Sequence, residues 1–255
     1  MAPPAPDERP TVRQTDQAEA ERDARAERIL DAATETLVAL GYRRVTVDDV
    51  AKRAGVGKGT VYLHFHTKEL LFITVLMRAQ AAMVRRHIDA MRADPEQVRP
   101  SALAYSNYLM VEEAPITRAM LTGDSEILGS LAQIGTRELA DFARARIAFM
   151  TDYFTTLREN GVVRTDAAVE PQLHAYFRIF YGYIAAEPVT QSLRTDTPES
   201  RTASDAAMLA HVVRAAFETS SDDPALARAA APRIIELFRR LLTRVTEEID
   251  NQKRT

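Results

Sequence analysis

Side chains that could bind phosphate gather in one short stretch of the chain, between Leu40 and Leu70. Six basic residues stand there against three acidic ones, a net charge of +3, although the whole chain of 255 residues has a formal net charge of −3. Hydroxyl-bearing residues, including Thr46, Thr60 and Tyr62, lie among the bases. Lysine and arginine bind phosphate through their charge, and hydroxyl groups add hydrogen bonds. The stretch therefore indicates contact with a polyanion by one part of an otherwise acidic chain.

Two short helices joined by a tight turn would position these side chains. Thr46 can cap the first helix, and Asp48 and Asp49 suit the positive end of its dipole. This helix ends at Gly55, and a second one is predicted from about residue 58 to residue 65. A longer helix with one apolar face precedes them and stops at Gly41. The arrangement predicts a helix-turn-helix.

The spacing of apolar residues in the second helix separates an inward face from an outward face. With Val61 and Phe65 inside, Gly59, Thr60 and Leu63 point outward. In a DNA major groove, the glycine would permit close approach, the threonine could bond a base edge or a phosphate, and the leucine could touch a thymine methyl. The candidates for phosphate contact are Thr46, Lys58, Tyr62, His64 and Lys68.

Simpler roles compete with these assignments. Thr46 could serve only as a helix cap, and Tyr62 and His64 could pack between helices. His64 and His66 could together bind a metal ion, but no cysteine or suitable set of carboxylates accompanies them. We therefore expect no metal here.

The order of residues across this region resembles the DNA-binding domain of the TetR family of transcriptional regulators. The resemblance covers about 50 of the 255 residues, and it departs from the family at Gly57, where a small hydroxyl residue is common. The family implies a second, helical domain that binds a small molecule and dimerises. The segments that carry the resemblance are Ile29-Leu30-Asp31-Ala32-Ala33, Gly41-Tyr42, Thr46-Val47-Asp48-Asp49-Val50-Ala51, Ala54-Gly55-Val56-Gly57-Lys58-Gly59-Thr60-Val61-Tyr62-Leu63-His64-Phe65 and Lys68-Glu69-Leu70-Leu71.

Composition and periodicity predict an all-α fold. The chain has only nine glycines, and we find no alternating run long enough to form a strand. We expect a disordered arm at residues 1–20, a three-helix DNA-binding domain at 21–67 and a larger helical ligand-binding and dimerisation domain at 68–255. The helices expected in the last of these, ended by prolines and glycines, are 67–93, 101–113, 115–131, 136–160, 170–187, 202–219 and 225–250.

Several classes of protein are disfavoured. The absence of cysteine excludes disulfides, thiolate metal sites and a cysteine nucleophile, and suits a reducing compartment, so we expect a cytoplasmic protein. No stretch approaches the roughly 18 apolar residues of a membrane span. The phosphate loops and nucleophile motifs of common enzymes are missing. We expect neither an enzyme nor a bound cofactor.

Aromatic residues are frequent in the second half of the chain, where they could line a ligand pocket. Such stripes more often form plain core, so both interpretations stand. Arg146 and Arg178 are nearby cations that an acidic ligand could recruit. The candidate ligand-binding residues are Tyr105, Phe149, Tyr153, His174, Phe177 and Tyr181.

The leading hypothesis is a homodimeric regulator that binds a pseudo-palindromic DNA operator as a repressor and is released by a small, mostly apolar or aromatic ligand. The dimer interface is expected on helices 170–187 and 202–219, unless helix 225–250 displaces one of them. One alternative is a helical ligand carrier or enzyme that retains a degenerate helix-turn-helix. Another is a partner-binding regulator without a ligand, which would have a filled core in place of a cavity.

Overall fold

A computed structural model describes residues 12–122, 125–128, 131, 140–190 and 198–254. Helices and turns account for this part of the chain, apart from an isolated β-bridge between Val163 and Glu218, so the all-α prediction is confirmed. The helices are α1 Val12–Arg44, α2 Val47–Ala54, α3 Lys58–His64, α4 Lys68–Ala93, the 3-10 helix η1 Pro95–Val98, α5 Pro100–Glu113, α6 Pro115–Thr122, α7 Ser125–Leu128, α9 Ala140–Glu159, α10 Val169–Thr190, α11 Pro198–Phe217 and α12 Pro224–Arg254.

The predicted helix-turn-helix is present as α2 and α3, and its ends are fixed by local interactions. The Thr46 hydroxyl accepts a hydrogen bond from the Asp49 amide at 3.2 Å, and the Asp49 carboxylate accepts one from the Thr46 amide at 2.9 Å. This reciprocal pair is a capping box. Gly55 ends α2 in the left-handed conformation, with φ 67°, which a residue with a Cβ rarely adopts. Both signals were readable from the sequence.

Helix α1 differs from its prediction at the N-terminal end. It begins at Val12, whereas the sequence predicted a disordered arm through residue 20 and a helix from about Arg22. Residues 17–28 are almost all Ala, Glu, Arg, Gln and Asp, and most of these are good helix formers, so the helix continues although it lacks apolar periodicity there. The rest of the predicted arm, residues 1–11, lies outside the described residues. The predicted break at Gly41 is present as a kink, with φ 72°.

Prolines begin helices more often than they separate them. Pro100, Pro115, Pro198 and Pro224 each occupy the first position of a helix, where no amide donor is needed. Consequently α11 starts four residues before its predicted position, residue 202. Pro232 lies inside α12, which continues through it. The helix predicted at 115–131 is described as two helices, α6 and α7.

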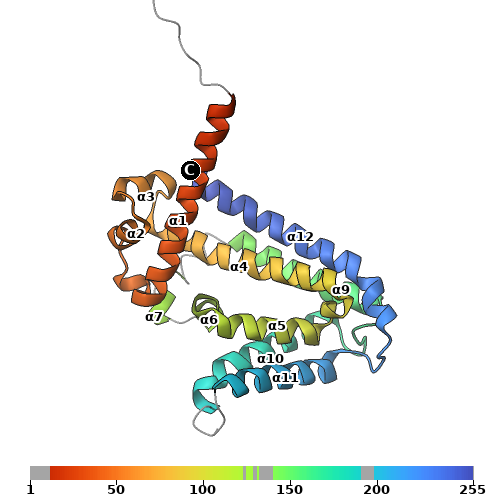
Figure 1. Cartoon of the computed structure of the whole chain (residues 1–255). Coiled ribbons are helices and arrows are strands. Elements are labelled where there is room, and N and C mark those ends of the chain that lie inside the picture. Colours follow the sequence, from red (N-terminus) through yellow and green to blue (C-terminus); the bar gives the residue numbers. More distant parts are fainter. Residues whose placement is uncertain (1–11, 123–124, 129–130, 132–139, 191–197, 255) are drawn as a thin grey trace, which may run out of the picture.

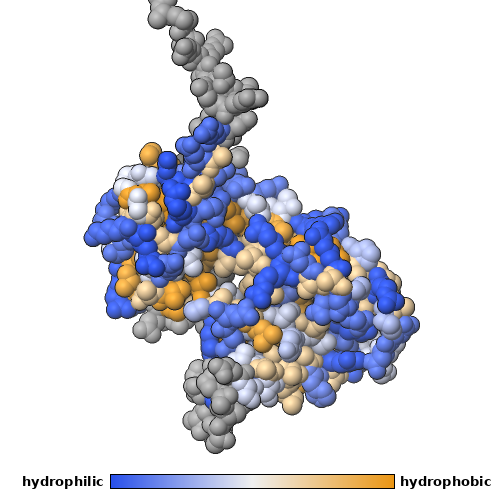
Figure 2. Space-filling model, in the orientation of Figure 1, coloured by the Kyte–Doolittle hydropathy of each residue, from blue (hydrophilic) through white to orange (hydrophobic). Residues whose placement is uncertain are grey.

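Two parts of the molecule are visible in Figure 1. Helices α1, α2 and α3 cluster at one end, and α4 runs from them into a larger helical part, with α12 alongside it. Helix α5 packs against α11, and α10 lies beside α11. Figure 2 shows mostly hydrophilic residues on the visible outer surface of α1 and α12. In the described part of the chain, no helix has the length and apolar character needed to cross a membrane.

The end of α12 returns to the end of the molecule that is formed by α1, α2 and α3. The Lys253 ammonium lies 2.8 Å from the Glu27 carboxylate of α1, and Arg22 donates to the Lys253 carbonyl at 3.3 Å. In the interior, the Thr74 hydroxyl of α4 bonds the Gln252 side chain at 2.8 Å. Helix α12 therefore connects the larger part directly to α1 and to the first half of α4.

Candidate nucleic-acid interface and internal cavity

The two faces of α3 lie as the sequence predicted. Val61 and Phe65 are each 1% exposed and belong to the buried core. Leu63 is 74% exposed and Tyr62 39% exposed, and Gly59 is exposed as well. A leucine with most of its surface in water is unusual for its residue type. The outward side of α3 therefore exposes apolar and polar groups.

One cation, Lys58, flanks this face. Lys58 is exposed at the first position of α3, and its ammonium lies 2.8 Å from the carboxylate of Asp48, also exposed. The hydrogen bond to Asp48 raises the pKa of Lys58 above its ordinary value, so the side chain is fully charged at neutral pH. Exposed ion pairs are weak, so the lysine can exchange this partner for a phosphate. Thr46, at the start of α2, is also exposed.

His64 does not lie where a phosphate contact would require it. It follows Val61 by three residues and therefore shares its buried face, with 4% of its surface exposed. Burial lowers the pKa of His64, and the nearby charges of Arg22 and Arg25 lower it further, which favours the neutral ring. The simpler alternative of packing between helices describes this residue correctly.

Lys68 is engaged inside the protein. Its ammonium donates to the Tyr42 carbonyl at 2.8 Å and lies 4.3 Å from the centroid of the Tyr42 ring. Burial lowers the pKa of Lys68. The Tyr42 hydroxyl also donates to the Glu69 carboxylate at 3.0 Å. In this conformation Lys68 joins the start of α4 to the end of α1 and is not directed outward to phosphate, contrary to the prediction.

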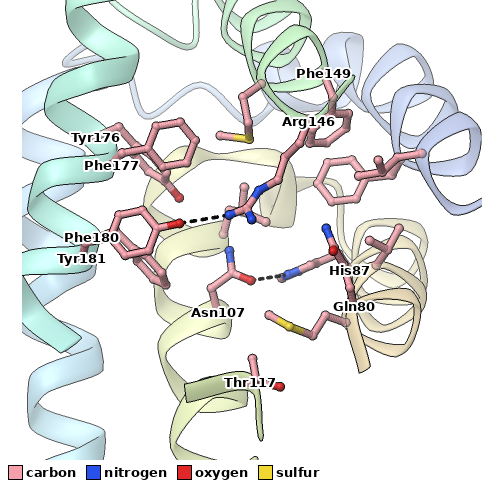
Figure 3. A pocket seen from close by; sticks show the side chains of 16 residues that line it. Gln80, His87, Asn107, Thr117, Arg146, Phe149, Tyr176, Phe177, Phe180 and Tyr181 are labelled. Atoms are coloured by element: carbon pink, nitrogen blue, oxygen red, sulfur yellow. Dashed lines mark hydrogen bonds between the residues drawn. The ribbon is translucent and has the colours of Figure 1, made fainter. Parts of the chain in front are cut away.

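A cavity of about 160 Å³ lies in the larger helical part, between α4, α5, α9, α10 and α12. Figure 3 shows side chains from these helices converging on it. Its apolar wall is made largely of aromatic rings, with Phe149 and Phe238 in an edge-to-face contact at 4.8 Å between centroids. The residues that line it are Gln80, Met83, Val84, His87, Leu103, Asn107, Thr117, Arg146, Phe149, Met150, Tyr176, Phe177, Phe180, Tyr181, Phe238 and Leu241.

Half of the predicted ligand residues line this cavity: Phe149, Phe177 and Tyr181. The other three do not. Tyr153 is fully buried and donates its hydroxyl to the Val98 carbonyl at 2.7 Å, so it belongs to the core. His174 is exposed on α10, and Tyr105 is 39% exposed on α5. The structure therefore places these three residues outside this cavity.

Polar side chains that sequence analysis did not select also reach the cavity. The Asn107 side-chain oxygen accepts a hydrogen bond from His87 Nε2 at 2.8 Å, across α5 and α4. Burial lowers the pKa of His87, partly offset by this bond, so the neutral imidazole is favoured. The sequence did contain a sign of this buried polar group, because His87 interrupts the apolar stripe of Val84, Ile88 and Met91 on α4.

The helix-turn-helix end of the chain matches a known family of regulators. The sequence model described as "Bacterial regulatory proteins, tetR family" matches residues 29–75, which include α2, α3 and the start of α4. The regulator YhgD of Bacillus subtilis is 28% identical over 146 residues, 56% of this chain and 71% of that protein. The transcriptional activator FasR of Mycolicibacterium smegmatis is 33% identical over 91 residues, 34% of this chain and 42% of its own.

Solved structures extend the likeness to the larger helical part. The regulator FadR from Bacillus subtilis, crystallised with stearoyl-CoA, has a TM-score of 0.56 at 16% identity, over 73% of this chain and 96% of its own. SmeT, the repressor of a Stenotrophomonas maltophilia multidrug efflux pump, has a TM-score of 0.54 at 20% identity, over 77% and 91%. At these identities the likeness concerns the fold.

Proposed function

We propose that this chain, which belongs to the TetR family of helix-turn-helix transcriptional regulators, is a homodimeric repressor released from its operator by a small ligand bound in the cavity. The family is one of DNA-binding regulators and not of enzymes. The observation that carries the ligand part of the proposal is the cavity between α4, α5, α9, α10 and α12. It disfavours a partner-binding regulator with a filled core.

The outward face of α3 supports docking into the major groove. Replacing Lys58 or Tyr62 by alanine is expected to weaken operator binding, because each removes a phosphate donor from this face. The salt dependence of binding should flatten by roughly one unit of slope for the lysine contact. Both side chains are exposed, so the melting temperature should hardly change. Fluorescence anisotropy with labelled operator DNA at several salt concentrations measures both effects.

Arg240→Ala is the matched control for these two variants, because Arg240 is an exposed base on α12, where it pairs with Glu236 at 3.1 Å. Its operator affinity should equal that of the wild type. Unchanged affinity in both the Lys58 and Tyr62 variants would contradict the assignment of this face to DNA.

Helix α4 supports a route from ligand to DNA. It contributes Gln80, Val84 and His87 to the cavity, and its first turn is joined to the end of α1 by the Lys68 and Glu69 bonds to Tyr42. A ligand that shifts α4 would therefore also shift α1 and, with it, α2 and α3. In a dimer, such a shift changes the spacing of the two recognition helices and favours the conformation that does not fit DNA.

Phe177→Ala and Tyr181→Ala are expected to reduce ligand-induced release without weakening operator binding in the absence of ligand. Both residues line the cavity, and α10, which carries them, lies away from α3 (Figure 1). Fluorescence anisotropy of labelled operator DNA measures how much of it each compound in a panel of aromatic and aliphatic compounds releases. His174→Ala is the control, since it changes an exposed residue of the same helix. Intact release in both cavity variants would contradict the proposed site.

The proposal that the chain represses transcription needs separate support. Of the similar proteins, SmeT is described as a repressor and FasR as an activator, so the direction of control needs its own test. A reporter gene transcribed from the promoter that contains the operator should be more active when the gene for this protein is deleted. Lower activity on deletion would indicate an activator.

The dimer interface is proposed on α10 and α11, which lie at the end of the molecule away from α3 (Figure 1). The exposed residues of α11 include several small residues and Met208, which is 53% exposed, together with His211 and Arg214. The apolar stripe of α12, including Ile234 and Val245, is buried against the same chain and is not available to a partner.

Met208→Arg is therefore expected to yield monomers in sedimentation analysis, because a charge would be buried at the centre of the interface. Ala229→Arg adds the same charge at an exposed position of α12 and should leave the dimer intact. A dimeric Met208→Arg protein would place the interface elsewhere. Truncation before α12 is less informative, because it also removes Phe238 from the cavity wall.

A further inference from the structure

The cavity contains a positive charge with no counter-charge. Arg146 is the one residue with a fixed charge among the described residues that line it, and no aspartate or glutamate is among them. Its guanidinium donates to the Tyr181 hydroxyl at 3.2 Å, and in the described part of the chain no carboxylate pairs with it. A guanidinium has five N–H donors, so most of its hydrogen-bonding capacity faces no protein acceptor.

Neutral donors surround this cation. Because the Asn107 oxygen accepts from His87, its amide group has two N–H donors left, and Figure 3 shows this amide near Arg146. The Tyr181 hydroxyl accepts from Arg146, which leaves its own proton free to donate. Tyr176 is buried with a hydroxyl that has no hydrogen-bond partner. A buried hydroxyl without a hydrogen-bond partner destabilises the fold unless another molecule supplies that partner.

We infer that the cavity binds a small organic monocarboxylate, whose carboxylate is held by Arg146, Asn107 and Tyr181 while its apolar body lies against the rings of Phe149 and Phe238. This inference rests on the proposed function, because it names the chemical class of the ligand for the same cavity. A single cation balances a single negative charge. The planar guanidinium fork also matches the two oxygens of a carboxylate.

The size of the cavity limits the apolar body. A cavity of about 160 Å³ is close to the roughly 150 Å³ of an engineered apolar cavity that accommodates benzene. The ligand body is therefore about one aromatic ring or an aliphatic chain of similar volume. Phenylacetate fits this description, and phenethyl alcohol and phenethylamine have a similar body with a neutral or a cationic end.

Calorimetric titration of the full chain with these three compounds tests the inference. The wild type should bind phenylacetate about tenfold or more tightly than either of the others, as expected for charge-assisted hydrogen bonds. Arg146→Gln should remove this preference, with phenylacetate losing about tenfold in affinity and phenethyl alcohol changing less than about threefold. Arg146→Lys should give an intermediate preference, because it keeps the charge and loses the fork.

Arg178→Gln is the matched control, since Arg178 is an exposed arginine on α10 outside the cavity, and its titrations should match the wild type. The inference is overturned if the wild type binds none of the three compounds, if it shows no preference for the acid, or if the preference persists without Arg146. Should Arg146→Gln fail to fold, the wild-type preference and the Arg146→Lys titration decide.

Operator release by the same compounds separates this inference from the proposed function. If phenylacetate binds through Arg146 without releasing DNA, the inference stands and ligand control of DNA binding fails. If phenethyl alcohol releases the operator as well as phenylacetate does, ligand control stands and the carboxylate inference fails.

Discussion

Replacing Phe65 by alanine is expected to destabilise the protein by about 3–5 kcal/mol, the usual cost of deleting a buried aromatic ring. Phe65 ends α3, where its amide bonds the Val61 carbonyl at 2.9 Å, and its ring is among the largest fully buried side chains. DNA binding should fail because α3 loses the buried side chain that holds its orientation. Urea denaturation followed by circular dichroism measures the change.

Leu63→Ala provides the matched control, because it removes an apolar side chain from the same helix on the opposite face. At 74% exposure, Leu63 contributes little to packing, so the denaturation midpoint should remain near that of the wild type. Its operator affinity should nevertheless decrease. If Phe65→Ala unfolds at the same urea concentration as Leu63→Ala, the orientation of α3 described above is incorrect.

The helix-turn-helix could be predicted closely because short-range interactions determine it. Thr46, Asp49 and Gly55 act on atoms within a few residues of themselves, and the capping box and the left-handed glycine need no distant partner. His64 lies on a different face from the one expected for a related reason. The residue types around it favoured phosphate contact, but its three-residue spacing from Val61 placed it on the buried face.

The cavity could be predicted only in part, because it depends on how separate helices meet. On α10 the buried side is centred on Leu173, Tyr176 and Phe180, so Phe177 and Tyr181 lie at its edge and reach the cavity. His174 lies further round the helix and is exposed. The helical periodicity of the sequence placed His174 on the same face as Phe177 and Tyr181. Which part of that face is buried depends on how α9 packs against α10, and the sequence does not show this.

The pairing of His87 with Asn107 also could not be predicted from the sequence. The two residues are 20 positions apart on different helices, and neither belongs to a motif. A histidine in an apolar stripe signals a buried polar partner, but the sequence does not say which residue supplies it. The buried polar groups of the cavity therefore became visible only in the folded chain.

Gly59→Glu is expected to cause the largest loss of DNA binding among single exposed substitutions. Gly59 is exposed on α3, and a Cβ added there would meet no atom of the chain within 4 Å, so nothing inside the protein requires a glycine. A glutamate on this face would oppose the phosphates and occupy space where α3 approaches the groove. Because a dimer carries the change twice, we expect the operator affinity to fall at least about a hundredfold.

Gly59→Ala separates the effect of size from the effect of charge. Alanine should stabilise the fold by about 0.4–1 kcal/mol, because it restricts the unfolded chain and fits the open space around Gly59. If α3 lies close to DNA, operator affinity should fall even so, by less than with glutamate. Higher stability combined with weaker binding cannot arise from a folding defect, so this pair of measurements assigns the glycine to the interface. An operator affinity within about threefold of the wild type for Gly59→Glu would instead place α3 away from DNA.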